Sequence, residues 1–184
     1  AALLALAVMF TGCSAPAESE SGAALPDVVG SMDIRYAEQF SVDYLADGSA
    51  LAEVADGRRY LIIPDGGEVP EQLPEDVTVI SQPENIYLAS SSSMDLFSSL
   101  DCLGDILASS TPESGWKLPE IAQAMADEDI LYAGKYSSPD IELLMSEGCD
   151  LAIENMMIYH SPKTAEQIES CGIPVFIERS SAES

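Results

Sequence analysis

The sequence predicts an α/β fold, in which a Rossmann-like parallel sheet over residues 77–184 follows a β-hairpin-rich segment over residues 32–76. Three observations favour this fold class. Short apolar runs alternate with amphipathic stretches of helical length, at about twenty residues per step. Two of these stretches begin with a Ser-Pro pair, which suits a helix N-terminus, and three end on glycine, which suits a C-terminus. Strand, helix and strand in this order build a parallel sheet with right-handed crossovers.

Residues 1–13 have the character of a signal peptide remnant. The apolar run AALLALAVMFTGC is too short to span a bilayer permanently, and small residues precede Cys13. The order Phe-Thr-Gly-Cys resembles the cleavage box of bacterial lipoproteins, which implies a lipid on Cys13, a membrane anchor through that lipid and an extracytoplasmic location. Residues 14–31, which begin with a mixture of Ser, Ala, Pro and Glu, are expected to form a flexible tether.

Residues 32–76 are rich in β signals. The runs FSVDYL and LAEVADGRRYLIIP alternate apolar and polar side chains, and the turn-forming pair Asp47-Gly48 lies between them. We expect a hairpin or a small meander here. Residues 65–76 contain several Gly and Pro and are expected to form a loop.

Residues 77–184 carry the α/β pattern. The expected strands are residues 77–80, 86–89, 105–109, 130–133, 150–154 and 173–178. The expected helices lie near residues 92–103, 118–127, 139–147 and 162–171. Two helix starts are expected at Ser138-Pro139 and Ser161-Pro162, and three helix ends at Gly104, Gly148 and Gly172.

The charge of the chain is strongly negative, with 32 acidic residues against 7 Lys and Arg and a formal net charge of −25. Nucleic acids and anionic membrane surfaces would be repelled by this charge, so neither is expected as the main partner. The ordinary meaning of such a composition is a solvated acidic surface; the alternative is an acidic rim that attracts a cationic ligand.

Three cysteines remain after Cys13, and an odd number cannot all pair. Cys149 and Cys171 each precede an apolar strand-like run, so a disulfide between them is one interpretation. Free thiols at these positions and at Cys102 are the interpretation that we prefer.

The chain contains none of the motifs of common enzyme classes, such as a Gly-rich phosphate loop, GxSxG, HExxH or CxxC. The chain has a single His, His160, and nothing else in the sequence supports a Ser-His-Asp triad. We therefore expect a binding protein and not an enzyme, without a catalytic residue, a metal site or an intrinsic cofactor.

Ligands of open parallel sheets bind beyond the carboxyl ends of the strands. The expected fold places five loops there: residues 90–94, 110–116, 134–138, 155–161 and 179–184. They combine hydroxyls, aromatic rings, thioethers and cations, a mixture that suits a bulky and partly apolar ligand. The candidate ligand-binding residues are Ser91, Ser92, Met94, Trp116, Lys135, Tyr136, Met156, Tyr159, His160, Arg179 and Ser180.

Several of these residues have a second interpretation. His160, Tyr159 and Met156 would suit a metal or a porphyrin, but a lone loop His is more often solvated and Met often fills gaps in packing. Trp116 would form a stacking wall or anchor the core. Arg179 would bind an anionic group of a chelate or pair with a neighbouring carboxylate.

Two stretches, GKYSSPDIELLMSEGCDLAIEN and HSPKTAEQIESCGIPVFIERSS, resemble the N-terminal lobe of ABC-transporter substrate-binding proteins of the iron-siderophore, heme and cobalamin class. The resemblance covers roughly residues 77–184 and implies a class III periplasmic-binding-protein N-lobe. It further implies a metal chelate as ligand (iron-siderophore, heme or cobalamin) and an ABC permease and ATPase complex as partners. In that family a bridging helix and a second lobe complete the cleft, and both are absent from this sequence.

Two other function classes stay open at this point. One is a surface lipoprotein whose β-rich segment binds another protein. The other is a lobe of a chelatase-like or nitrogenase-like enzyme, which would require metal or nucleotide motifs.

Overall fold

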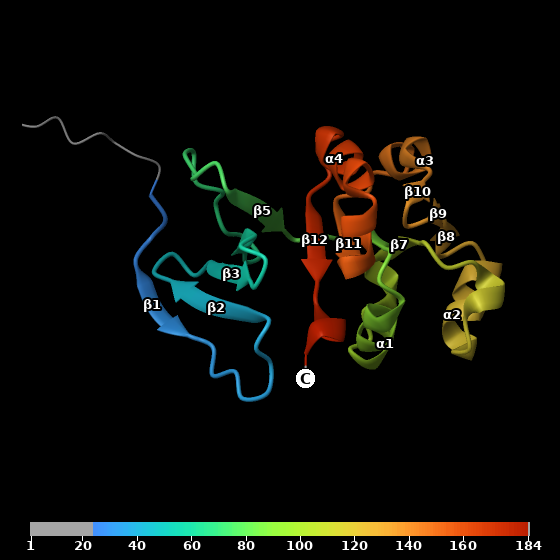
Figure 1. Cartoon of the computed structure of the whole chain (residues 1–184), viewed down its shortest axis with the longest axis horizontal. Helices are drawn as coiled ribbons and strands as arrows, with labels where there is room; N and C mark the ends of the chain where they lie inside the picture. The colour runs from blue at the N-terminus through green and yellow to red at the C-terminus, as the bar shows by residue number, and fades with distance from the viewer. Residues whose placement is uncertain (1–23, 184) are drawn as a thin grey trace, which may run out of the picture.

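The computed structural model describes residues 24–183 and shows two five-stranded sheets side by side (Figure 1). The expected signal peptide, the lipidation site Cys13 and residues 14–23 of the expected tether lie outside the described residues. Among the described residues, no helix has both the length and the apolar character that a membrane span requires.

The first sheet is mainly antiparallel and follows the chain order. Its strands are β1 (Val28–Ser31), β2 (Phe40–Leu45), β3 (Ala50–Val54), β4 (Arg59–Ile63) and β5 (Val77–Ser81). Gly48 adopts a φ of 87° in the turn between β2 and β3, which confirms the turn expected at Asp47-Gly48.

Two boundaries differ from the expectation. Strand β5 was expected to begin the α/β part, but it pairs in parallel with β4 and belongs to the first sheet. Strand β1 occupies the last four residues of the expected tether and pairs with β2. In both cases the apolar and β-branched residues were visible in the sequence, but the partner strand was not.

The second sheet is wholly parallel and confirms the predicted fold class. Its order is β12 (Val175–Glu178), β11 (Leu151–Asn155), β6 (Ile86–Leu88), β7 (Ile106–Ser109) and β8 (Leu131–Tyr132). Chain order therefore reverses direction between β6 and β11, which is the topological switch point of an open parallel sheet.

Four helices cover the two faces of this sheet: α1 (Ser91–Ser99), α2 (Pro119–Ala126), α3 (Ile141–Ser146) and α4 (Pro162–Ser170). Met94 of α1 and Ile121 of α2 are fully buried in one core cluster, and Leu144 of α3 and Ile168 of α4 in the other. Coverage of both faces explains why the strands read as nearly continuous apolar runs.

The helix ends follow the prediction only in part. Pro162 is the first residue of α4, and Gly148 and Gly172 have positive φ after α3 and α4, as expected. Ser138-Pro139, however, lies in a short strand, and α3 is capped instead by Asp140, whose carboxylate accepts a hydrogen bond from the Leu143 amide at 3.0 Å.

The end expected at Gly104 is also wrong. Helix α1 stops at Ser99, and the left-handed conformation that follows it is taken by Asp101 (φ 58°). Asp is one of the few side chains that tolerate this conformation. Gly104 lies in the 3-10 turn Leu103–Asp105.

The cysteines of the described residues are all free. Cys149 is buried, and Cys102 and Cys171 are half-buried. The preferred interpretation of free thiols is confirmed, and the alternative bridge between Cys149 and Cys171 is absent.

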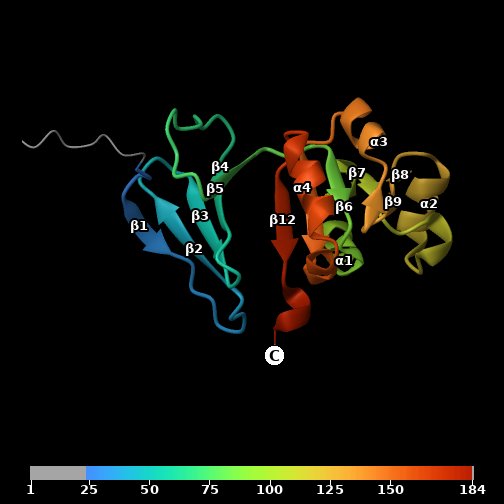
Figure 2. The same ribbon diagram turned by 45° about the horizontal axis from the view of Figure 1, so that its top comes forward.

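The two sheets meet at the outer edge of β12, as both ribbon views show (Figures 1 and 2). The Tyr60 hydroxyl of β4 donates to the Val175 carbonyl at 3.1 Å and accepts from the Ile177 amide at 3.4 Å. The rings of Tyr60 and Phe176 lie 4.8 Å apart. The first sheet thereby satisfies backbone groups that an open strand edge would leave unpaired.

Candidate functional site: a cavity at the carboxyl edge of the parallel sheet

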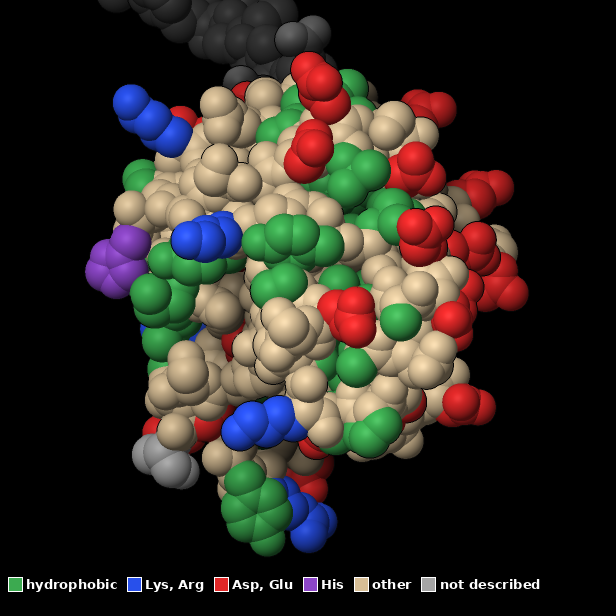
Figure 3. Space-filling view, turned by 90° about the vertical axis from the view of Figure 1, so that its right-hand side faces the viewer, with side chains coloured by type: hydrophobic (Ala, Val, Ile, Leu, Met, Phe, Trp, Pro, Cys, Tyr) green, Lys and Arg blue, Asp and Glu red, His purple; other side chains and the backbone are tan. Residues whose placement is uncertain are grey.

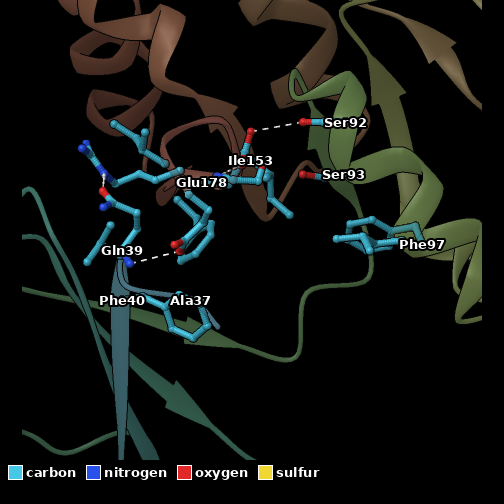
Figure 4. A pocket seen from close by; sticks show the side chains of 15 residues that line it. Ala37, Gln39, Phe40, Ser92, Ser93, Phe97, Ile153 and Glu178 are labelled. Atoms are coloured by element: carbon cyan, nitrogen blue, oxygen red, sulfur yellow. Dashed lines mark hydrogen bonds between the residues drawn. The ribbon is translucent and has the colours of Figure 1, made fainter. Parts of the chain in front are cut away.

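The carboxyl ends of β11 and β12, helix α1 and the start of β2 enclose a cavity of about 610 Å³. Its walls are mainly apolar and are formed by Phe40, Leu96, Phe97, Ile153 and Phe176, together with Ala37, Val54 and Ile177. Phe97 faces the cavity from α1, across from Gln39 and Phe40 (Figure 4). The cavity therefore lies at the edge of the sheet where ligands of open α/β folds bind.

A carboxylate, Glu178, organises the polar rim. It accepts hydrogen bonds from the Ser90 hydroxyl at 2.7 Å, the Ser92 hydroxyl at 3.3 Å and the Ser180 amide at 2.7 Å. Partial burial alone would raise the pKa of Glu178, but the hydrogen bonds from Ser180, Ser90 and Ser92 outweigh it and lower the pKa. Glu178 is therefore an ionised group that ties the start of α1 to the segment after β12.

The cation of the rim is Arg179, whose partners are neutral. Its Nε donates to the Gln39 side-chain oxygen at 3.0 Å and its Nη1 to the Tyr159 hydroxyl at 3.4 Å. No carboxylate of the described residues lies within ion-pair distance of Arg179. The structure therefore does not show the ion pair between Arg179 and a neighbouring carboxylate that was one of its two interpretations.

Tyr159 links this rim to the first sheet. Its hydroxyl donates to the Asp56 carboxylate in the turn between β3 and β4. Burial and the hydrogen bond to Asp56 raise the pKa of Tyr159. The phenol is therefore neutral, and it holds Arg179 and Asp56 in one network.

The structure brings together some of the candidate residues and separates others. Ser92, Arg179 and Ser180 line the cavity, and Tyr159 contacts Arg179. Met94 does not line the cavity, because its side chain is fully buried in the core. Ser91 is exposed at the first turn of α1.

Trp116 packs against the core and donates its indole N–H to the Thr111 carbonyl at 3.2 Å. This is the core-anchoring interpretation of the residue.

Lys135 and Tyr136 lie at the other end of the same edge. They follow β8, in the small hairpin formed by β9 (Gly134–Lys135) and β10 (Ser138–Pro139). Lys135 is exposed, and Tyr136 packs against the core.

Met156 and His160 belong to the 3-10 helix Met156–His160 that follows β11. Met156 is half-buried and His160 is exposed. Within residues 24–183, no cluster of three His, Cys, Asp or Glu side chains could hold a metal ion. A metal-binding role of His160 has no such cluster to support it.

The sequence did not predict the cavity residues next to and in the first sheet, nor the two carboxylates of the cavity, Glu178 and Glu183. Phe40 is the first residue of β2 and Gln39 directly precedes it. Glu183 accepts hydrogen bonds from the Glu38 amide at 2.7 Å and the Gln39 amide at 3.0 Å. No local pattern connects segments so far apart in the chain. Glu178 had one available signal, since it is an acidic residue directly at the carboxyl end of a predicted strand.

Two polar side chains, Tyr87 and Glu154, are buried on the face of the parallel sheet that points away from the cavity. The hydroxyl of Tyr87 and both carboxyl oxygens of Glu154 have no hydrogen-bond partner among the described residues, and both side chains are fully buried. Burial raises the pKa of Glu154 to about 8. Burial and the neighbouring Glu154 also raise the pKa of Tyr87. At neutral pH, Glu154 is therefore a protonated carboxylic acid inside the core.

No family model matches the chain, and no curated protein matches it. Sixteen chains of solved structures match. One of them is the petrobactin-binding protein YclQ from Bacillus subtilis, with a TM-score of 0.44 and 14% sequence identity over 70% of this chain and 37% of that chain. A TM-score below 0.5 does not establish a common fold, and this chain spans well under half of that protein.

Proposed function

We propose that this protein is a solute-binding protein that holds a small molecule in the cavity at the carboxyl edge of its parallel sheet. The observation that carries the proposal is the composition and place of the cavity: apolar walls of about 610 Å³ with a rim of Ser92, Glu178, Arg179 and Ser180. Small-molecule sites typically combine apolar walls with a few polar groups that orient the ligand.

The finer part of the proposal follows the resemblance of residues 77–184 to substrate-binding proteins of ABC importers. The ligand is an iron complex or a related metal chelate, such as an iron-siderophore, heme or cobalamin, which the protein delivers to an ABC permease and ATPase complex. The protein acts outside the cytoplasm, anchored to the membrane by a lipid on Cys13. It binds without turnover and carries no intrinsic cofactor, so the metal is cargo.

A second candidate function is favoured by exposed apolar side chains of the first sheet region. Val28 and Val29 of β1 are 56% and 67% exposed, and Tyr36 is 91% exposed. Such side chains suit an interaction with another protein. In this alternative the protein is a surface lipoprotein and the parallel sheet is its scaffold.

The test is a thermal-shift and absorbance screen of the full-length protein against ferric chelates, heme, cobalamin and free metal ions. A ligand at a hundredfold excess over its dissociation constant stabilises the folded state by about 2.7 kcal/mol. A shift with one chelate supports the importer function. A folded protein that shifts with none of them supports the surface lipoprotein.

A pair of variants tests the cavity itself. Leu96→Arg places a long cationic side chain at the cavity wall, and it should abolish the shift because the space for the ligand is filled. Leu100→Arg is the matched control, since Leu100 directly follows the last residue of the same helix, is more exposed than Leu96 and does not line the cavity. Equal binding by both variants would place the ligand elsewhere.

A further inference from the structure

We infer that the ligand carries an aromatic, largely apolar group, which lies among the phenylalanine rings of the cavity. This inference rests on the proposed function, because it names the chemical class of the ligand for the same site. Iron chelates differ in whether they present aryl groups or only aliphatic groups to a protein, so the distinction separates possible cargoes.

The phenylalanines of the described residues all line this cavity. Phe40 is the first residue of β2, Phe97 lies in α1 and Phe176 lies in β12. None of the three is fully buried, although phenylalanine is among the side chains most often found in protein interiors. The largest fully buried side chains are instead Leu, Ile, Met and Tyr. The most apolar rings of the described residues are therefore placed where a ligand can reach them.

The three rings come from elements that are far apart in the chain. Phe97 faces the cavity from α1, across from Phe40 (Figure 4). Phe176 is supported by Tyr60 of β4, whose ring centroid lies 4.8 Å away at an interplanar angle of 55°. Tilted ring pairs at this distance are favourable. Within residues 24–183, neither Phe40 nor Phe97 forms such a pair, so their rings are available to an aromatic ligand.

The cavity also exposes large apolar side chains. Phe40 is 42% exposed, and Leu96, one residue before Phe97 on α1, is 61% exposed. Figure 3 shows that apolar side chains on another face of the molecule are interspersed with charged and polar groups. Burial of apolar surface is favourable roughly in proportion to its area. A ligand with an apolar group would gain this free energy at the cavity wall, and a wholly polar ligand would not.

The polar side chains of the cavity are mostly engaged with other groups of the protein. The carboxylates Glu178 and Glu183 accept hydrogen bonds from hydroxyls and backbone amides of neighbouring segments. The Gln39 side-chain oxygen accepts from Arg179. A ligand that competed for these groups would break hydrogen bonds that the protein already makes. The apolar wall therefore discriminates between ligands more strongly than the rim does.

The size and place of the cavity favour a small molecule over a second protein surface. Its volume of about 610 Å³ lies within the usual range of small-molecule pockets, about 300–1,000 Å³. It lies at the edge where ligands of open α/β sheets bind. Among metal chelates, the expected class is therefore the one with aryl groups or an aromatic macrocycle, and not the one with aliphatic hydroxamate or carboxylate groups alone.

The experiment measures the affinity of the full-length protein for two neutral probes, ferric tris-benzohydroxamate and ferric tris-acetohydroxamate. Both present the same donor atoms to iron, and they differ in three phenyl groups against three methyl groups. A difference in affinity therefore arises neither from charge nor from the metal centre. We expect the phenyl complex to bind at least about tenfold more tightly. Free hydroxamate without iron serves as the blank.

Replacement of Phe40 assigns the preference to the rings. Phe40→Ser should weaken binding of the phenyl complex several-fold and leave the methyl complex nearly unaffected. Tyr44→Ser is the matched control, because Tyr44 lies on the same face of β2, has nearly the same exposure (43% against 42%) and does not line the cavity. Both side chains are partly exposed, so both variants are expected to fold. Phe40→Leu keeps the wall apolar without the ring and should lose part of the preference.

The outcomes are distinct. Equal affinity for the two complexes, or tighter binding of the methyl complex, overturns the inference and leaves the solute-binding function intact. Binding of neither complex overturns the inference alone if the folded protein binds another chelate, and both proposals if it binds none. Equal losses in Phe40→Ser and Tyr44→Ser, or a full preference in Phe40→Leu, also overturn the inference. The same holds for a dimer that Phe40→Ser dissociates, because a second copy would then cover the rings.

Discussion

The polar side chains of the two sheet regions differ in whether they have partners. In the first sheet region every arginine is ion-paired, and the turn aspartates Asp47 and Asp56 accept hydrogen bonds from backbone amides two residues on. In the parallel sheet region, four cations have no carboxylate partner, and Tyr87 and Glu154 hold the buried side-chain oxygens without a hydrogen bond among the described residues. A scaffold satisfies its own charges, whereas a binding surface retains groups for a ligand. The difference supports the proposal that the ligand binds at the parallel sheet.

The largest effect is expected where the two regions meet. Tyr60→Ala removes a fully buried ring that packs on Phe176 and leaves Val175 and Ile177 of β12 without their partner. We expect the free energy of unfolding to fall by about 3–5 kcal/mol. Tyr60→Phe, which keeps the ring, should cost about 1–2 kcal/mol for the lost hydrogen bonds. Urea denaturation measures both. A cost below about 1 kcal/mol for Tyr60→Ala would mean that the two sheets fold independently of this contact.

The next effect concerns the buried acid of the parallel sheet. Burial raises the pKa of Glu154 from its ordinary 4.5 to about 8, so between these values the folded state holds a proton that the unfolded chain has lost. Stability should therefore fall as pH rises through this window, by about 1 kcal/mol per pH unit, and level off above it. Glu154→Gln removes the ionisable group. Denaturation of both proteins at several pH values measures the difference, and parallel curves would contradict a buried proton.

Glu178 is expected to show the opposite sign. Its pKa is lowered in the folded state, so its contribution to stability is present above about pH 4.5 and is lost as pH falls through the folded pKa. Glu178→Gln should therefore reduce stability at neutral pH, by about 1 kcal/mol for weakened hydrogen bonds to Ser90 and Ser180, and should have less effect in acid. A cost that persists unchanged in acid would show that the charge of Glu178 is not what these groups bind.

The elements of the parallel sheet could be predicted from the sequence because their signals are local. Apolar runs, Ser161-Pro162 and the glycines after α3 and α4 each depend on a few neighbouring residues. The predictions were wrong where a partner strand distant in the chain determines which sheet a segment joins. The residues of β5 have strand character in any environment, and only pairing with β4 assigns them to the first sheet.

The site was predicted less completely than the fold, for the same reason. The loops after β6 and β12 were expected to hold ligand residues, and Ser92, Arg179 and Ser180 do line the cavity. Phe40 begins β2 and Gln39 directly precedes it, and both reach the cavity only because the first sheet docks against β12. Serine spacing in SSSSM did not show that Met94 points into the core.

The capping residue of α3 provides a smaller test. Asp140→Ala removes the carboxylate that accepts from the Leu143 amide, and we expect a loss of about 1 kcal/mol in the free energy of unfolding. Ser138→Ala is the control, because Ser138 lies in β10 outside the helix and should change stability by less than about 0.5 kcal/mol. Thermal or urea denaturation compares them. A larger effect of Ser138→Ala would restore the Ser-Pro pair as the start of the helix.

The smallest effect separates the two kinds of cation directly. Arg59→Gln and Lys135→Gln each remove one positive charge from an acidic chain, so both increase the general repulsion equally. Only Arg59 has an ion-pair partner, Asp76 at 2.9 Å, and an exposed pair of this kind contributes about 0.2–1 kcal/mol. Arg59→Gln should therefore be less stable than Lys135→Gln by that amount in urea denaturation at low salt, and the difference should vanish at high salt. An equal or larger loss for Lys135→Gln would mean that Lys135 has a structural partner, and the parallel sheet would then lose one of the free charges that distinguish it from the first sheet.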